Sequence, residues 1–571
     1  MSRHTTLGRR TPRLTAIAGL AAAQLLWACI GSIGDHDGPD KNGPGPDGPE
    51  TLAQSIGETT RVARLTHEQY DNTVRDLLEQ PLTAPVYSTD FRTDASSGGY
   101  PFDNDTYVLS VDQGLHRSYE LAAAQIALDF INDTALYDKW VPSAGSDEER
   151  VRGFVESFGE RVHRRPLTPD QVDDYLALAP LGATTYEDTT GLQGSVRLIL
   201  EALFTSPYFL YRTELSNEAA GTVGGLDGIS KLTAYEIATR LSYTLWNTMP
   251  DDDLFAAAKS GALDDGDTLR AQVDRMLKDS RASALFAKVL SQAMGVYRYE
   301  NIKPNATFYP DAPSDLSSLA IEELSLLMQD AYDNDRSYRE LLTAPRTFVN
   351  QDTAPLYGLQ GSYGPEFEEA TLDASERRGL LTTIGFLASN SNSVNPDPIH
   401  RGLWVAQKLL CSSVAAPPGT IPPLPTPEPD QTNRQAIEAL TQAPGTDCNV
   451  CHGSLINPLG FPFENFDAVG AIRDNDRGLE LDLATVPLIE NEEMPVDGAL
   501  ELIDGLAERQ VVYDCYGQHL TSYLLGRPYR KEDQTLRNLI GKNAFEDSSL
   551  VDIIAEAVTS LQFTYRRLEN P

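Results

Sequence analysis

Residues 65–78, LTHEQYDNTVRDLL, hold the pattern that decides the fold class. Thr66 stands three residues before Gln69, so its hydroxyl can accept the amide hydrogen of Gln69 while the Gln69 side chain returns to the amide of Thr66. This reciprocal arrangement, the capping box, is typical of the first turn of an α-helix. Leu65 and Tyr70 flank the box and can pack against each other across that turn. The stretch therefore predicts a helix that begins at the threonine.

The same pattern occurs twice more along the chain. Thr168 precedes Gln171, and Thr233 precedes Glu236, at the same spacing. Apolar residues at helical spacing follow Thr233, stop near Pro250 and then resume, which predicts a helical hairpin. Further helical periods run through 196–204, 316–328, 380–387, 403–410, 511–525 and 550–561, whereas alternating strands are scarce. The sequence thus predicts a mainly α-helical protein.

The length of 571 residues is too great for one hydrophobic core, so we expect several small helical modules. A proline-rich stretch, 415–430, interrupts the chain and favours an extended polyproline conformation. The modules are predicted at 59–135, 150–217, 229–355, 375–475 and 490–566.

The N-terminal residues have the layout of an export signal. Arginines at positions 3, 9, 10 and 13 precede a largely apolar run, 14–28, which is too short to span a bilayer. We expect a signal peptide at 1–28 and a lipid on Cys29, because LWAC resembles a bacterial lipobox, although Trp27 is unusual there. An ordinary signal with a chance cysteine is the alternative. Residues 29–58, rich in Gly, Pro and Asp, are then expected to be a disordered tether.

The chain is strongly acidic, with 83 acidic and 46 basic residues and a formal charge of −37. Such a charge repels phosphate backbones, so nucleic acid is not expected as a partner. It also repels anionic lipid headgroups, so membrane attachment would depend on the lipid of Cys29 alone. We expect an exported, membrane-anchored lipoprotein, periplasmic or on the outer membrane or cell surface, with an unidentified redox or envelope protein as its partner.

The string CNVCH, 448–452, carries the clearest chemical signal. In an exported chain it is typical of one covalent haem c, with thioethers at Cys448 and Cys451 and His452 as an axial ligand of the iron. The same cysteines can instead form a local disulfide or a redox pair. A closed zinc site is disfavoured because no second ligand pair of matching spacing occurs in the sequence. Module 375–475 is therefore predicted to be cytochrome-c-like.

Two further assignments follow from the haem interpretation. The sixth iron ligand is predicted to be Met494, His400 or His519, with an open position as the alternative, and this choice decides whether the protein is an enzyme. Once lipid and haem occupy three of the five cysteines, Cys411 and Cys515 remain, and an oxidising compartment favours a disulfide between them.

Three function classes are compatible with these features. An envelope-tethered cytochrome that transfers electrons is preferred, and a haem-free helical binding or scaffold protein, with CNVCH as a disulfide, is the alternative. A hydrolase ranks last, since G-x-S-x-G, H-E-x-x-H and P-loop motifs are absent from the sequence. The acidic run 474–482 is a poor calcium loop because glycine stands where a ligand is expected, so we interpret it as a turn.

Several strings in the chain carry a family resemblance: RLTHEQYDNTVRDLL (64–78), RRPLTPDQV (164–172), SPYFLYRTEL (206–215), RLSYTLWNTMPDDDL (240–254), HRGLWVAQKLLC (400–411), CNVCHGSLINPLGFPFENFDAVGAIR (448–473) and YLLGRPYR (523–530). In this order they resemble the modular cytochrome-c-like proteins of planctomycetes and myxobacteria, which string domains of unknown function (PSD type) around a planctomycete-type cytochrome c domain. The resemblance covers about residues 60 to 565.

The family's haem motif falls on Cys448, Cys451 and His452, and the residues that follow, 457–460 and 463–470, also fit it. The resemblance implies a domain order and a haem c, but no established reaction or substrate. Within the fitting stretch, NPLGF suggests a tight turn that approaches a flat ring, and Phe461, Phe463 and Phe466 either cover that ring or belong to the core. Glu464, Asp467 and Arg473 are expected to form a local ion-pair network.

Overall fold

A computed structural model describes residues 56–215, 229–414 and 423–567. Helices dominate these residues, and their strands pair only into two-stranded ribbons, so the expectation of a mainly α-helical fold is confirmed. The predicted signal peptide, Cys29 and nearly all of the tether lie outside the described residues.

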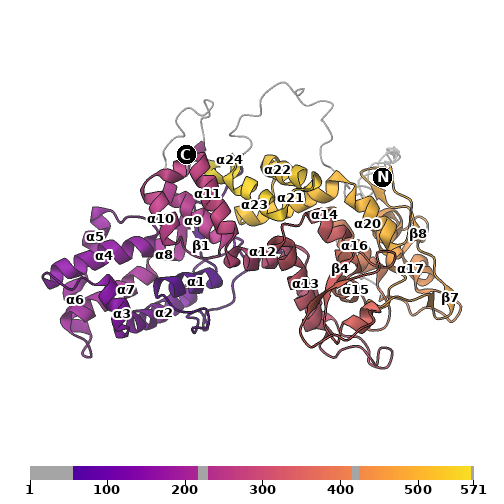
Figure 1. The fold of residues 1–571 in the computed structure, drawn as a ribbon, viewed down its shortest axis with the longest axis horizontal. Coiled ribbons are helices and arrows are strands. Elements are labelled where there is room, and N and C mark those ends of the chain that lie inside the picture. The colour runs from indigo at the N-terminus through magenta and orange to yellow at the C-terminus, as the bar shows by residue number, and fades with distance from the viewer. Residues whose placement is uncertain (1–55, 216–228, 415–422, 568–571) are drawn as a thin grey trace, which may run out of the picture. The chain divides into compact units, whose positions relative to one another are not determined.

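The described chain divides into two compact units (Figure 1). The first unit comprises residues 301–319 and 343–512, and the second comprises 56–300, 320–342 and 513–567, without the gap at 216–228. The residues of three helices are divided between the units: α13 (Leu316–Asp333), α14 (Tyr338–Thr343) and α21 (Gln510–Leu525).

The second unit is built almost entirely of helices. Its longer helices are α1 (His67–Leu77), α2 (Gln113–Asn132), α3 (Thr134–Trp140), α4 (Asp147–His163), α5 (Pro169–Leu176), α6 (Ala179–Thr185), α7 (Gly191–Thr205), α9 (Ala234–Leu245), α10 (Asp252–Lys259), α11 (Gly266–Leu277), α12 (Ser280–Ala293), α22 (Gln534–Phe545) and α23 (Leu550–Thr559). Shorter elements are α8 (Pro207–Leu210), α24 (Leu561–Thr564) and the 3₁₀ turns η2 (Ala262–Asp264), η3 (Val296–Asn301) and η8 (Lys531–Asp533).

The capping boxes begin helices where the sequence predicts them. Thr66 caps α1, Thr168 caps α5 and Thr233 caps α9, each with both reciprocal hydrogen bonds. The predicted hairpin is also confirmed, because α9 ends at Leu245 and α10 begins at Asp252.

Two ribbons close long stretches of the second unit. Strand β1 (Val62–Arg64) pairs antiparallel with β2 (Tyr211–Thr213), and β3 (Ile229–Lys231) pairs antiparallel with β12 (Tyr565–Arg567). Each ribbon therefore joins residues that are far apart in the sequence, which a reading of local patterns does not predict.

The core of the second unit includes a cluster of aromatic rings between α2, α4 and α7. Phe130, Phe154 and Phe158 contact one another at centroid distances of 5.1 to 5.7 Å, and Phe204 packs edge to face on Phe209. A fully buried ion pair lies elsewhere in the unit, where Arg527 donates to both carboxylate oxygens of Asp533 at 2.7 Å. The aromatic cluster joins helices that are far apart in the sequence, whereas the ion pair is local.

The first unit contains shorter elements. Its helices are α15 (Ile384–Ser389), α16 (Pro398–Lys408), α17 (Asn433–Thr441), α18 (Asp447–Cys451), α19 (Asn457–Gly460) and α20 (Ala499–Ala507), with the π-helix η6 (His452–Ile456) and the 3₁₀ turns η4 (Ala354–Tyr357), η5 (Leu380–Thr382) and η7 (Phe461–Phe463). Its ribbons are β4 (Arg346–Val349) with β5 (Glu368–Thr371), β6 (Asn475–Asp476) with β7 (Leu479–Glu480), β8 (Ala484–Thr485) with β11 (Val496–Asp497), and β9 (Leu488–Ile489) with β10 (Glu492–Glu493).

One predicted helix differs from expectation. The period at 380–387 is divided between η5 and α15, because Thr383 is extended and its hydroxyl accepts from the amide of Phe386 to begin a new helix. The periods at 196–204, 403–410, 511–525 and 550–561 coincide largely with α7, α16, α21 and α23, and the period at 316–328 lies within α13.

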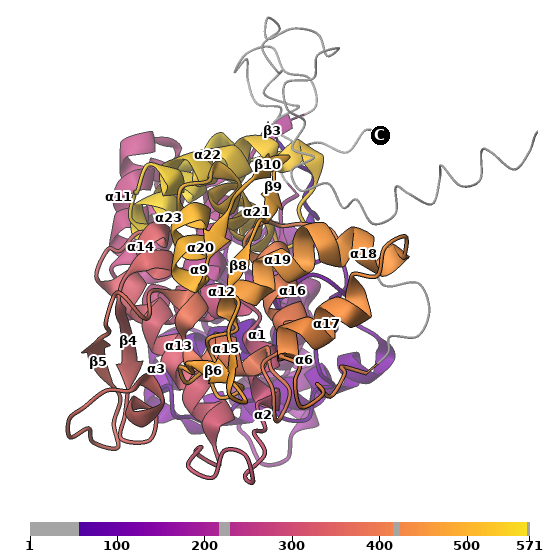
Figure 2. The same ribbon diagram turned by 90° about the vertical axis from the view of Figure 1, so that its right-hand side faces the viewer.

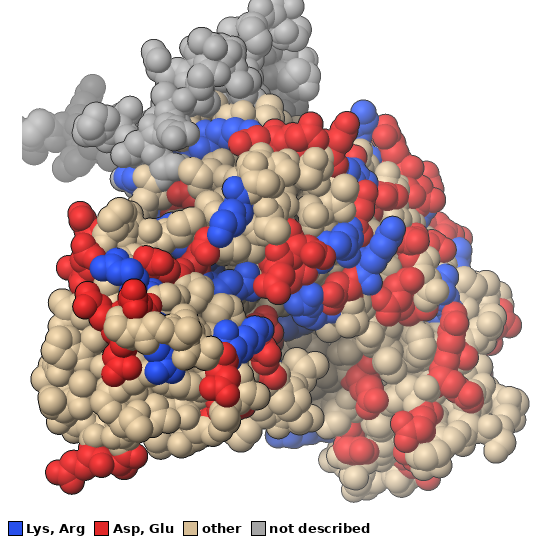
Figure 3. Space-filling model, turned by 60° about the vertical axis from the view of Figure 1, so that its left-hand side comes forward, with Lys and Arg blue, Asp and Glu red and all other residues tan. Residues whose placement is uncertain are grey.

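Acidic and basic side chains intermix on the face of the molecule that Figure 3 shows. Some of these charges pair among the described residues, as where Arg270 lies 2.7 Å from Asp274 and 2.8 Å from Glu556, whichever face they occupy. Among the described residues, every helix is too short or too polar to cross a membrane.

Candidate functional site: the CNVCH segment

The two cysteines of CNVCH lie on one short helix of the first unit. Thr446 caps α18 by accepting from the amide of Asn449 at 3.3 Å. Cys448 and Cys451 are three residues apart, so their side chains project from the same face of this helix. Cys448 is exposed, Cys451 is half-buried, and no disulfide joins the two. Both cysteines therefore lie on one face of α18.

A π-helix follows the cysteines and positions His452. The amide of Asn457 donates to the carbonyl of His452, five residues earlier, which is the hydrogen bond that defines a π-turn. This turn brings the two side chains together, and His452 Nδ1 lies 2.9 Å from Asn457 Oδ1. In an α-helix, residues five apart point in different directions, so the π-turn is what makes this contact possible.

A chain of hydrogen bonds fixes the tautomer of His452. The Thr441 hydroxyl lies 2.7 Å from the carbonyl of Ile437, which can only accept, so the hydroxyl donates there. Asn457 Nδ2 then donates to Thr441 Oγ1 at 2.9 Å, which turns Asn457 Oδ1 towards the imidazole. Since an amide oxygen can only accept, the proton of a neutral His452 resides on Nδ1. The lone pair on Nε2 is thereby left for a metal.

Helix α16 crosses α19 beside this segment at very short range (Figure 2). A Cβ atom on Gly402 would lie 1.9 Å from the carbonyl oxygen of Ile456, and one on Gly460 would lie 1.8 Å from that of Pro398. Neither contact is possible for a side chain, so both positions require glycine. The crossing holds the end of the π-helix against α16.

The NPLGF stretch differs from the predicted turn. Its first four residues form α19, and Gly460 allows the approach of α16 instead of the approach of a flat ring. Phe461, Phe463 and Phe466 are buried, and Phe463 packs edge to face on Phe386. These aromatic residues therefore belong to the core of the first unit.

The predicted ion-pair network forms only in part. Glu464 is buried and accepts from Arg473 at 3.1 Å, and Arg473 also reaches Asp476 at 3.2 Å. Burial raises the pKa of Glu464, although Arg473 opposes the shift. Asp467 instead accepts from the amides of Val469 and Ala471, both at 2.9 Å. The network joins the chain after the haem motif to the hairpin of β6 and β7.

That hairpin accounts for the acidic run 474–482. Arg477 and Gly478, both with positive φ, connect β6 to β7, and Asp476 is buried against Arg473. The run is therefore a tight turn, as the sequence indicated.

A buried arginine donates hydrogen bonds to several backbone carbonyls that follow this segment. Arg401, on α16, donates to the carbonyls of Phe463, Phe466 and Asp467 at 2.7 to 3.0 Å. Burial lowers the pKa of Arg401 to about 10. The carbonyls of Phe463 and Asp467 also accept backbone amides, so the guanidinium is an additional donor to them and holds these turns against α16.

The candidate sixth ligands occupy different surroundings. Met494 is buried against Gly505, and its sulfur accepts from Arg509 Nε at 3.4 Å. His400 lies in the first turn of α16 and is half-exposed, with Nδ1 2.5 Å from a carboxylate oxygen of Asp397. His519 lies on α21, within the second unit. The identity of the sixth ligand stays a prediction.

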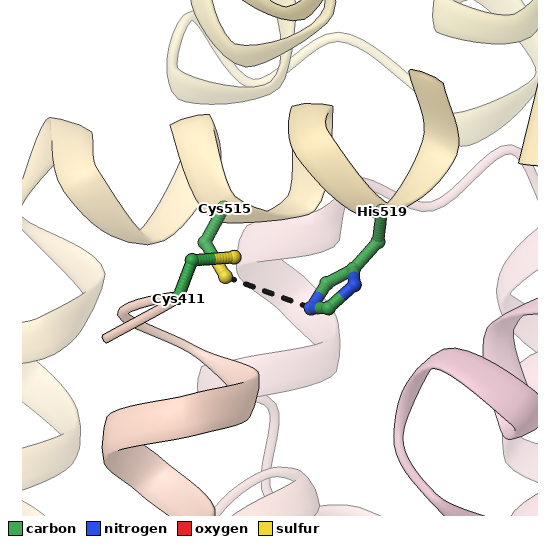
Figure 4. A group of neighbouring side chains, drawn as sticks. All are labelled: Cys411, Cys515 and His519. Atoms are coloured by element: carbon green, nitrogen blue, oxygen red, sulfur yellow. Dashed lines mark hydrogen bonds between the residues drawn. The ribbon is translucent and has the colours of Figure 1, made fainter. Parts of the chain in front are cut away.

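The remaining cysteines are drawn in Figure 4 with His519. On α21, Cys515 Sγ lies 3.6 Å from His519 Nε2, one helical turn away. Cys411 follows α16 with a φ of 48° and belongs to the first unit, whereas Cys515 belongs to the second. Pairing of Cys411 with Cys515 therefore stays a prediction.

The hydrogen bonds by which Asn457 and Thr441 fix the His452 tautomer are not predicted by the sequence. Asn457 was placed in the stretch that fits the family, without a function, and Thr441 lies outside that stretch. The signal for Asn457 was its position five residues after the histidine and directly before Pro458, which has no amide hydrogen for a regular helix.

Four family models match successive parts of the chain, each described as a protein of unknown function. They are PSD3 (DUF1587) at residues 63–132, PSD5 (DUF1595) at 150–214, PSD4 (DUF1592) at 232–359 and PSCyt3 (DUF1588) at 377–476. The PSCyt3 match contains the whole CNVCH segment. No curated protein and no solved structure matches the chain. The module boundaries drawn from sequence stay predictions. The order of these four matches shows that the chain belongs to the planctomycete-type modular cytochrome-c-like proteins that carry PSD domains.

Proposed function

We propose that the CNVCH segment holds one covalent haem c and that the protein is a redox component of the cell envelope. The single observation that carries this proposal is the hydrogen-bond chain from Ile437 to His452, which leaves Nε2 unprotonated beside two cysteines on one helix face. A disulfide or a surface loop needs no such control of the imidazole.

The residues fit the group by their chemistry. Cys448 and Cys451 would hold it through thioethers, and His452 Nε2 would ligate its iron. When bound, haem c supplies one-electron redox chemistry. Asn457 Oδ1 orients the imidazole by accepting a hydrogen bond from Nδ1. Electron transfer is the role we propose, because one-electron chemistry is what a haem c held by these residues would supply.

Attachment to the membrane through a lipid on Cys29 is part of the same proposal. The strong negative charge of the chain supports anchoring by lipid rather than by the protein surface, and it favours a partner with a basic docking face.

The test is the colour of the protein. The full chain, produced in a host with cytochrome c maturation machinery, should show a Soret band that survives acid acetone extraction. A Cys448→Ala, Cys451→Ala double variant should lose that band, whereas His116→Ala, an exposed change in the second unit, should keep it. A colourless wild-type product with a Cys448–Cys451 disulfide would support the haem-free scaffold instead.

A further inference from the structure

The second unit contains a cleft whose lining includes none of the residues of the CNVCH segment. It has a volume of about 360 Å³ and lies between the end of α4, the α8–β2 segment and the start of α9. Pockets for small organic ligands begin at roughly this size and often form where modules meet. Its lining includes His163, Arg165, Tyr208, Tyr235 and Glu236.

Arg165 supplies donors that nothing in the described chain accepts. Its Nη1 donates to the carbonyl of Pro166 at 2.7 Å and to Gln171 Oε1 at 3.1 Å, and its guanidinium lies 4.9 Å from the centre of the Tyr208 ring. Nε and Nη2 have no partner among the described residues. These contacts hold the guanidinium in place while two of its nitrogens remain available.

Among the described residues that line the cleft, Glu236 is the one carboxylate, and it already has partners. Glu236 Oε2 accepts from the amide of Thr233 at 2.9 Å and from its hydroxyl at 3.1 Å, as part of the α9 capping box. Glu236 acts on Arg165 through its charge, but in the described chain the hydrogen bonds of Arg165 go to Pro166 and Gln171, with no carboxylate among them. Nε and Nη2 of Arg165 thus offer donors to an anion from solution.

The rest of the lining suits the uncharged part of a small organic ligand. The hydroxyls of Tyr208 and Tyr235 have no hydrogen-bond partner among the described residues, and Tyr235 packs edge to face on Phe255. His163 is buried behind Tyr208, with ring centroids 5.1 Å apart, and burial lowers its pKa to about 3. With His163 neutral, the charged side chains among the described lining are Arg164, Arg165 and Glu236, two positive and one negative, and one ligand carboxylate balances the net charge of +1.

The net charge of the protein decides which anion fits. A field from a formal charge of −37 disfavours polyanions such as nucleic acid or polyphosphate far more than a monoanion. We propose that this cleft binds a small organic monocarboxylate, with the carboxylate bonded to Arg165 and the body of the ligand against Tyr208 and Tyr235. The pairing uses the fork geometry in which arginine binds carboxylates.

The experiment is isothermal titration of the full chain with three probes: benzoate, a hexuronate, and benzamide as the uncharged counterpart of benzoate. Benzoate, the hexuronate or both should bind. If benzoate binds, benzamide should bind with an affinity at least about tenfold lower, because it lacks the charge. Inorganic phosphate distinguishes a general anion site from a carboxylate site. Stronger binding of phosphate than of both carboxylates would overturn the proposal, as would no binding of either carboxylate.

Variants locate the binding. Arg165→Gln should weaken the affinity for the carboxylate by about tenfold or more. Tyr235→Phe is a second variant: it changes the cleft lining but leaves the contacts of Arg165 intact, and it too should weaken the affinity. The matched control is Arg152→Gln on α4, which removes the same charge from an exposed position of the same unit. Equal loss of affinity in Arg152→Gln and Arg165→Gln would show that the cleft is not the site. Because no haem residue is changed, the result is independent of the haem proposal.

Discussion

His452 and Asn457 are five residues apart in the sequence, yet their side chains are in contact, with Nδ1 of His452 2.9 Å from Oδ1 of Asn457. The π-helix between them creates this contact, and Thr441 fixes its direction. An unusual helical turn is thereby used to set the protonation of one imidazole nitrogen. π-Turns of this kind are frequent at functional sites.

Changes at Asn457 test this arrangement. Asn457→Leu removes the acceptor, so the imidazole becomes less basic and the midpoint reduction potential of the haem protein should rise, whereas Asn457→Asp should lower it. Asn457→Leu should also decrease the free energy of unfolding by about 1–3 kcal/mol, because Thr441 loses a buried partner. Potentiometric titration measures the first effect. Equal potentials in the two variants would contradict a role for Asn457 in orienting His452.

Gly402 tests the helix crossing. Gly402→Ala places a methyl group where only 1.9 Å separates it from a backbone oxygen, so α16 and α19 must move apart. We expect a loss of about 1–3 kcal/mol in the free energy of unfolding of the first unit, measured by urea denaturation. The control is Gly364→Ala, in the same unit, where a Cβ atom meets nothing within 4 Å. Similar losses in both variants would argue against a tight crossing.

Glu464 gives a prediction for pH. Burial raises its pKa in the folded protein, so the folded state binds the proton more tightly than the unfolded chain does. Ionisation of Glu464 is then opposed by folding, and wild-type stability should fall relative to Glu464→Gln as the pH rises from the unfolded pKa through the raised folded value. Urea denaturation of both proteins at a series of pH values from acid to neutral measures the difference. A difference that changes in favour of wild type with rising pH would mean that Arg473 dominates and lowers this pKa.

The disulfide between Cys411 and Cys515 is tested by a peptide map. Under non-reducing conditions the exported protein should yield one peptide that joins the two cysteines, and the Cys448→Ala, Cys451→Ala double variant should yield the same peptide. The bridge closes a loop of about 100 residues, so its loss should cost ~4 to 5 kcal/mol in the chain-entropy description. Recovery of Cys411 and Cys515 as separate alkylated thiols would refute the pairing.

Local patterns in the sequence predict the helix starts because a capping box needs residues only three positions apart. Thr66, Thr168 and Thr233 therefore begin helices as expected. The pairing of Val62 with Thr213 depends on the packing of everything between them, and no local pattern encodes it.

In the candidate site, too, the local motif is predictable from sequence and the contacts between distant segments are not. Cys448, Cys451 and His452 form a contiguous motif that is recognisable from sequence. The roles of Thr441 and Gly402 follow from helices that meet only in the folded chain, so the sequence alone does not show them.

The most direct test of the account is the mass of the peptide that contains Cys448 and Cys451, from exported protein made with the maturation machinery. The account predicts that this peptide carries one porphyrin bonded to both cysteines and that His452→Ala changes the visible spectrum of the protein. A peptide of unmodified mass, with the two cysteines reduced or joined to each other, would contradict it.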